Sequence, residues 1–156
     1  NGNNKIKYTY QTEQITGINK KYLVVREMDS SNHVIFDLKT GNKTEGYTFV
    51  SLTSNVVFLS KNVNNKVEYF EFKDGSVTPL FSAPTSLSTD IYIIGNENSK
   101  NTLMVDGKVV LEDIEYASSI MTYRDEETFK TYRVIRVVKN NTVTHYRVVA
   151  PELFTS

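Results

Sequence analysis

The 156-residue chain contains no cysteine and no tryptophan, and it carries no excess of charge of either sign. Without cysteine there is no disulfide framework, no zinc–thiolate centre and no cysteine nucleophile. No apolar run approaches the ~18 residues that a membrane-spanning helix requires. The 18 basic and 18 acidic residues cancel, whereas nucleic-acid-binding proteins typically carry a surplus of positive charge. We therefore expect no nucleic-acid partner and no membrane span.

The apolar segments of the chain are short and rich in β-branched and aromatic residues, which favours strands over helices. Residues Lys5–Gln11 alternate between apolar and polar side chains, as a half-buried strand does. Residues Glu112–Met121 are interpreted as strand and loop rather than helix. Further strands are expected at residues 21–27, 33–38, 47–52, 55–60, 66–72, 76–81, 90–95, 101–106, 108–113, 131–138 and 142–149.

These expected strands recur in a common pattern. The stretch NTLMVDGKVVLEDI (residues 101–114) belongs to one copy, in which a strand, a polar turn, a second strand, a tight glycine turn and a third strand follow one another. A self-similar period of about 35–40 residues built from short strands is typical of β-propeller blades and related arrays. Gly41, Gly75 and Gly107 occupy equivalent places, where a tight hairpin turn requires positive φ. The predicted repeats are residues 21–54, 55–89, 90–130 and 131–156, with residues 5–11 completing the last one.

Two of these copies, VIFDLKTGNKTEG (residues 34–46) and YFEFKDGSVTPLF (residues 69–81), resemble bacterial β-propeller repeats of the quinoprotein-like and TolB-like kinds. The resemblance extends from Lys21 to Pro151. It implies an all-β, propeller-like domain of antiparallel meanders at residues 5–156, and a two-sheet β-sandwich is the alternative. Residues 1–4 (NGNN) are interpreted as a linker stub of the sort that follows a removed signal or lipid anchor. This favours an extracytoplasmic or cell-surface protein of a bacterium, with a cytoplasmic location as the alternative.

The sequence shows little that indicates catalysis. Its two histidines, His33 and His145, lack the spacing of metal ligands, so each is expected to be a surface or hydrogen-bonded imidazole. No G-x-S-x-G motif is present to mark a serine nucleophile. Acidic residues cluster at Glu112, Asp113 and Glu115, and again at Asp125, Glu126 and Glu127. We interpret both clusters as solvated loops, and we expect no catalytic residue, metal or cofactor.

Four of the five arginines fall late in the chain, around an expected hairpin with Asn140–Asn141 at its tip. Asparagine tolerates the left-handed geometry of a two-residue turn. Such a turn pairs Val138 with Val143, Arg136 with His145, and Val134 with Arg147.

Arg136, His145 and Arg147 then share one face, where they form a candidate site for a carboxylate, phosphate or sulfate. The other face holds the expected core residues Ile135, Val137, Tyr146 and Val148. In the alternative interpretation, the arginines pair with nearby acids or stack on tyrosine.

The absence of a catalytic constellation and the abundance of tyrosine favour a non-enzymatic binding or scaffold module of an exported bacterial protein. Tyrosine combines apolar area with a polar tip, which suits interfaces. We expect a protein partner or an envelope glycan. The alternatives are a carboxylate-based glycan hydrolase and a small-anion-sensing domain.

Overall fold

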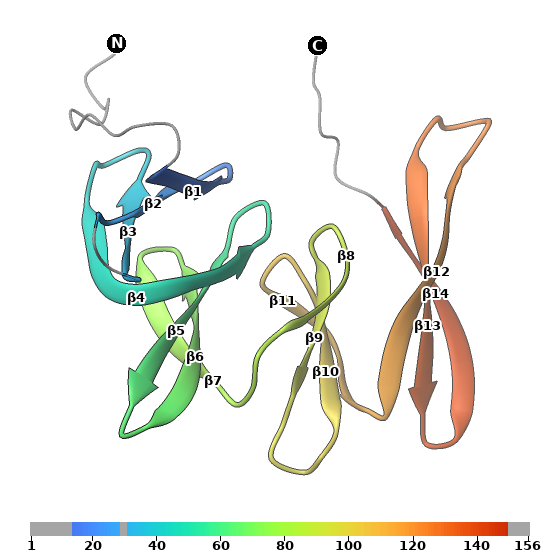
Figure 1. Cartoon of the computed structure of the whole chain (residues 1–156). Helices are drawn as coiled ribbons and strands as arrows, with labels where there is room; N and C mark the ends of the chain where they lie inside the picture. The colour runs from blue at the N-terminus through green and yellow to red at the C-terminus, as the bar shows by residue number, and fades with distance from the viewer. Residues whose placement is uncertain (1–13, 29–30, 150–156) are drawn as a thin grey trace. The chain divides into compact units, whose positions relative to one another are not determined.

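The computed structural model describes residues 14–28 and 31–149, and its regular elements are β-strands (Figure 1). Each paired strand runs antiparallel to its neighbour, so the predicted all-β class and antiparallel meanders are confirmed. The described residues include no helix long and apolar enough to cross a membrane. The expected strand at Lys5–Gln11 and the expected linker stub lie outside the described residues.

The chain divides into two compact units, Asn1–Ala83 and Pro84–Ser156. In the first unit the described strands are β1 (Ile15–Ile18), β2 (Tyr22–Arg26), β3 (His33–Asp37), β4 (Lys43–Leu52), β5 (Val57–Val63), β6 (Lys66–Lys73) and β7 (Ser76–Leu80). In the second they are β8 (Thr85–Ser88), β9 (Ile91–Gly95), β10 (Asn101–Val105), β11 (Lys108–Ile114), β12 (Tyr116–Arg124), β13 (Thr131–Lys139) and β14 (Thr142–Val149).

The first unit is a seven-stranded meander in which β4 belongs to two pairings. The first half of β4 pairs with β3 and its second half pairs with β5. The register between β3 and β4 shifts at Gly46, whose φ of 94° is a backbone conformation that favours glycine. β4 curves strongly, as bulged strands do (Figure 1). The core joins the two parts of the meander. Its buried members are Tyr22, Val24, Ile35, Val57, Leu59 and Phe72.

The second unit consists of two sheets packed face to face. A four-stranded sheet has the order β11-β10-β9-β8, and a three-stranded sheet has the order β12-β13-β14. Alternate residues of the strands build their shared core, as the pleat requires, except in β11, where a register shift brings both Leu111 and Ile114 to it. Its buried members are Ile91, Leu103, Ile114, Ala117, Ile135 and Val137. Tyr146 and Val148 pack against this core, which confirms the inward face predicted for the last hairpin.

Tight turns with positive φ set the register of the hairpins. Gly41, Gly75 and Gly107 have φ of 78°, 80° and 85°, as their equivalent places in the repeat predicted. Asn140 and Asn141 also adopt positive φ, at 52° and 59°. The two-residue turn between β13 and β14 is therefore the predicted one, and it gives the three predicted pairs, Val138 with Val143, Arg136 with His145, and Val134 with Arg147.

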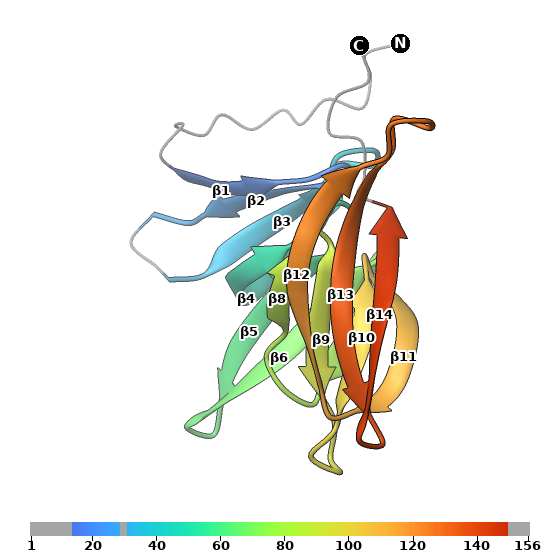
Figure 2. The same ribbon diagram turned by 90° about the vertical axis from the view of Figure 1, so that its right-hand side faces the viewer.

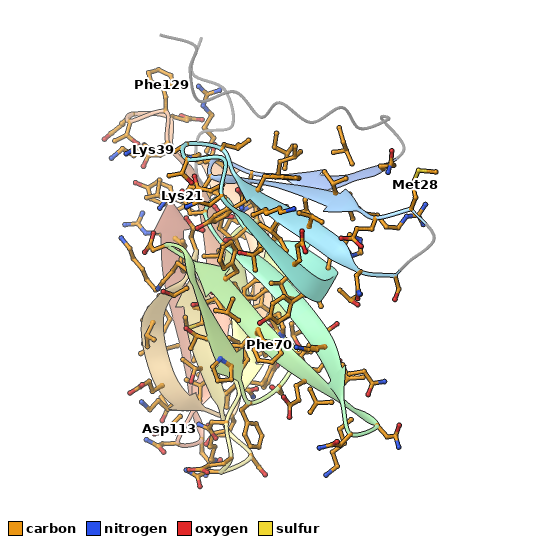
Figure 3. The ribbon with its side chains drawn as sticks, turned by 90° about the vertical axis from the view of Figure 1, so that its left-hand side faces the viewer. Lys21, Met28, Lys39, Phe70, Asp113 and Phe129 are labelled. Carbon is orange, nitrogen blue, oxygen red and sulfur yellow. The ribbon has the colours of Figure 1, made fainter. Side chains whose placement is uncertain are left out.

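Two longer hairpin loops, DLKTGN (residues 37–42) and DEETFK (residues 125–130), have the same geometry. In each, the first aspartate accepts hydrogen bonds through Oδ1 from the backbone N–H groups two and three residues later. The fifth position has positive φ in both loops, and it is Gly41 in the first and Phe129 in the second. Phe129 has φ of 61° and is 68% exposed at the tip of the β12–β13 hairpin (Figure 3).

His33 is a buried histidine that is held neutral. Its Nδ1 accepts a hydrogen bond from the backbone N–H of Phe49 at 3.0 Å, and a protonated ring would lose this bond. Burial lowers the pKa of His33 from its ordinary 6.5, and the charge of Arg26 lowers it further. The prediction that this histidine is a hydrogen-bonded imidazole is therefore confirmed.

The shared loop geometry predicts that substitution by alanine affects stability unequally at the two equivalent positions, 41 and 129. Gly41→Ala should lower the free energy of unfolding by about 1 kcal/mol, because a side chain is strained at positive φ while no neighbouring atom lies within 4 Å to add a clash. Phe129→Ala should change it much less, because a side chain already occupies the equivalent position. Urea denaturation of the two variants measures both effects. An equal decrease in the free energy of unfolding for the two variants would contradict the explanation from positive φ.

The lowered pKa of His33 predicts a loss of stability as the pH falls. Below pH 6.5 the unfolded state takes up a proton on His33 before the folded state does, so the free energy of unfolding decreases from pH 7 towards pH 5. His33→Gln should flatten that slope, because it removes the group whose pKa is lowered in the folded state. Urea denaturation at several pH values provides the test, and a slope unchanged by His33→Gln would contradict it.

Candidate functional site

The candidate site lies on the side of the β12–β14 sheet that does not contribute to the core of the second unit. Figure 2 shows this side towards the viewer, and we call it the outer face. By the alternation of side chains, it comprises Tyr116, Ser118, Met121, Tyr123, Tyr132, Val134, Arg136, Val138, Val143, His145, Arg147 and Val149.

The outer face exposes several large apolar side chains. Met121, Val149, Val143 and Tyr116 expose 54%, 52%, 46% and 44% of their area, respectively. The face carries two arginines and a histidine but no carboxylate. An exposed apolar patch with tyrosine, methionine and arginine has the composition that interfaces favour.

The structure brings the three predicted anion-site residues onto the outer face, but it does not join them into one cluster. Arg136 lies directly opposite His145 on the neighbouring strand. Arg147 lies opposite Val134, one row further along the sheet. The side chain of Arg147 extends across β13 and away from Arg136, because its guanidinium contacts side chains in the next row of the sheet.

Those contacts are with two tyrosines. Nη1 of Arg147 donates a hydrogen bond to the hydroxyl of Tyr123 at 3.0 Å, and this bond raises the pKa of the guanidinium. The same guanidinium lies over the ring of Tyr132, 4.9 Å from its centroid. The rings of Tyr123 and Tyr132 stack 5.5 Å apart. Stacking of this arginine on tyrosine agrees with the alternative interpretation offered by the sequence.

The bulge in β12 hides part of the outer face from sequence analysis. The register between β12 and β13 shifts between Ser119 and Met121. Tyr116 and Ser118 therefore alternate in one phase, and Met121 and Tyr123 alternate in the other. The sequence signal that could have identified Met121 and Tyr123 is the alternation of side chains after the bulge, which resumes one residue later than the alternation before it.

The first acidic cluster lies at the end of β11 and directly after it, so the expectation of a loop is wrong there, whereas the second cluster lies in the loop between β12 and β13 as expected. Glu115 accepts a hydrogen bond from Lys100 at 3.0 Å, and this bond lowers the pKa of its carboxyl group. Backbone N–H groups of Thr128 and Glu127 lower the pKa of Asp125. A general acid for glycoside hydrolysis needs a raised pKa, which is the opposite shift.

A small cavity in the second unit offers limited room for a ligand. It has a volume of about 160 Å³, and its lining includes Asp90, Asp106 and Val148. Ligand pockets for drug-sized molecules commonly measure about 300–1,000 Å³. Among residues 14–28 and 31–149, no group of three or more histidine, aspartate or glutamate side chains is placed to hold a metal ion.

The contacts of Arg147 predict different mobility for the two arginines of the outer face. The Nε–Hε group of Arg147 should be more ordered than that of Arg136, because the two tyrosines restrain its guanidinium. Tyr123→Phe removes the hydroxyl acceptor and should loosen Arg147 while Arg136 stays the same. Nitrogen-15 relaxation of both side chains measures this. An Arg147 as mobile as Arg136 in the unmodified protein would contradict the geometry.

Comparison of the chain with protein-family models, with curated proteins and with solved structures finds no match among any of the three.

Proposed function

We propose that the chain is a non-enzymatic binding module whose outer face binds a protein partner that presents apolar and acidic side chains. The observation that carries the proposal is the composition of this face, where exposed methionine, valine and tyrosine side chains surround positive charge. Burying the apolar side chains supplies the driving force, and carboxylates on the partner match the arginines.

A protein partner fits the outer face better than an envelope glycan does. Sugars stack on the open faces of aromatic rings, but the guanidinium of Arg147 lies over the ring of Tyr132. Tyr123 contributes its hydroxyl to Arg147 and its ring to the stack with Tyr132. Tyrosine and arginine held in this way are the residues that most often contribute strongly to binding energy at protein interfaces.

The propeller-like repeat and the exported bacterial setting remain parts of this proposal. The succession of antiparallel meanders along the chain supports the repeat.

Sensing of a small anion is the second candidate function. The direct juxtaposition of Arg136 and His145 favours it, because neither side chain has a hydrogen bond or ion pair among the described residues. Sulfate or phosphate bound there would raise the melting temperature of the protein, and Arg136→Ala would abolish the increase.

A photo-crosslinking amino acid at two matched positions tests the proposal. Met121 on the outer face and Val110 on β11 are exposed to a similar extent, at 54% and 43%. We expect the probe at position 121, but not at position 110, to form an adduct with a protein from the source cells.

The identified protein, once purified, should bind the unmodified chain and should bind Arg147→Ala at least roughly tenfold more weakly. Identical adducts from both positions would contradict the proposal. So would the absence of a protein adduct together with a thermal shift produced by sulfate or by an oligosaccharide.

A further inference from the structure

We propose that Phe129, at the tip of the β12–β13 hairpin, inserts into an apolar pocket of the protein partner and anchors the complex. The inference rests on the proposed function, to which it adds a second contact. Phe129 exposes 68% of its area, and its backbone adopts a φ of 61°, which is rare for a bulky residue (Figure 3). An exposed aromatic ring and a strained backbone therefore meet in one residue.

The fold itself does not require phenylalanine at this position. The loops DLKTGN (residues 37–42) and DEETFK (residues 125–130) share their hydrogen bonds, and the residue equivalent to Phe129 is Gly41. Glycine adopts positive φ without strain, whereas a residue with a Cβ does not. The same loop is thus built once with the relaxed residue and once with a strained one. Backbone strain of this kind concentrates at functional sites.

The contact of Phe129 within the chain does not account for the strain. The guanidinium of Arg124 lies over the ring of Phe129, 5.4 Å from its centroid. At an exposed site, such a contact contributes less free energy than the left-handed backbone conformation costs. Most of the ring faces solvent, and burying it in a pocket of the partner would supply the stabilisation that the free protein lacks.

The loop is ordered before any partner binds. Oδ1 of Asp125 accepts hydrogen bonds from the backbone N–H groups of Glu127 at 2.8 Å and Thr128 at 3.1 Å. The backbone N–H of Phe129 donates to the carbonyl of Asp125 at 2.9 Å, and that of Asp125 donates to the carbonyl of Lys130 at 2.9 Å. A ring presented on an ordered backbone loses less conformational freedom on binding, so more of the energy of burial becomes affinity.

The surroundings of the loop favour a protein pocket over a lipid bilayer. Glu126 and Glu127 are exposed beside Phe129, and their charges oppose insertion into an anionic membrane. The loop begins two residues after Tyr123 and ends two residues before Tyr132, and both tyrosines belong to the outer face. A protein bound to the outer face can therefore reach the loop. A pocket with a neutral or basic rim matches the two carboxylates.

Crosslinking from position 121 tests the inference in variants of the whole chain. The concentration of chain that gives half-maximal adduct measures the affinity for the partner. Phe129→Ala and Phe129→Gly remove the ring. The control is Phe81→Ala, because Phe81 is also 68% exposed but belongs to the first unit. Urea denaturation of each variant measures its stability.

We expect both Phe129 variants to raise the half-maximal concentration at least roughly tenfold, and Phe81→Ala to leave it unchanged. Phe129→Gly should also raise the urea midpoint, because glycine relieves the strain at this φ. A variant that is more stable and binds more weakly has lost a contact rather than its fold.

An unchanged half-maximal concentration in both Phe129 variants, or an equal increase in Phe81→Ala, would overturn the anchor and leave the outer face as the binding surface. A urea midpoint lowered by Phe129→Gly would contradict the strain. Binding of the unmodified chain, but not of Phe129→Gly, to phosphatidylcholine vesicles would overturn the protein pocket in favour of a bilayer. Crosslinking that does not distinguish positions 121 and 110 would overturn the proposed function, and this inference with it.

Discussion

The arrangement of side chains in this protein depends on the register of its hairpins, which the turns fix. Because side chains alternate between the two faces of a strand, a shift of one residue would exchange the core face for the solvent face. The left-handed residues Asn140 and Asn141 make a two-residue turn, and this turn directs Ile135 and Val137 into the core. It also places Arg136 and Arg147 on the opposite side. One local backbone constraint therefore decides both the packing of the second unit and the chemistry of its exposed face.

The same constraint places the proposed binding surface on the side of the last sheet that faces away from the core. A buried core uses one face of each sheet, so the residues of the opposite face are free to serve recognition. In the β12–β14 sheet these residues include tyrosines that hold Arg147 in place and aliphatic side chains that remain exposed. An ordered arginine loses less conformational freedom when it binds a carboxylate, which favours a specific partner over diffuse attraction.

Sequence reasoning predicted most of the strands because alternation and turn residues are local signals. The last hairpin was predicted to the residue, since Asn140–Asn141 specifies both loop length and register. β12 was expected only as part of a stretch of strand and loop at residues 112–121. The short strands β1 and β8 were missed altogether, and β1 contains Gly17. A Cβ added at Gly17 would lie 2.8 Å from Leu52, so this strand is defined by a close packing contact rather than by a local pattern. The contacts of Arg147 were likewise hidden, because they join three strands across a bulge.

The most direct test of this account is the cross-strand register of the last hairpin, measured by nuclear Overhauser effects between the backbone protons of β13 and β14. We expect Arg136 opposite His145 and Val134 opposite Arg147. That result would confirm that the cationic side chains share the outer face. Contacts displaced by one residue, with Arg136 opposite Thr144, would turn His145 and Arg147 towards the core and contradict the outer face.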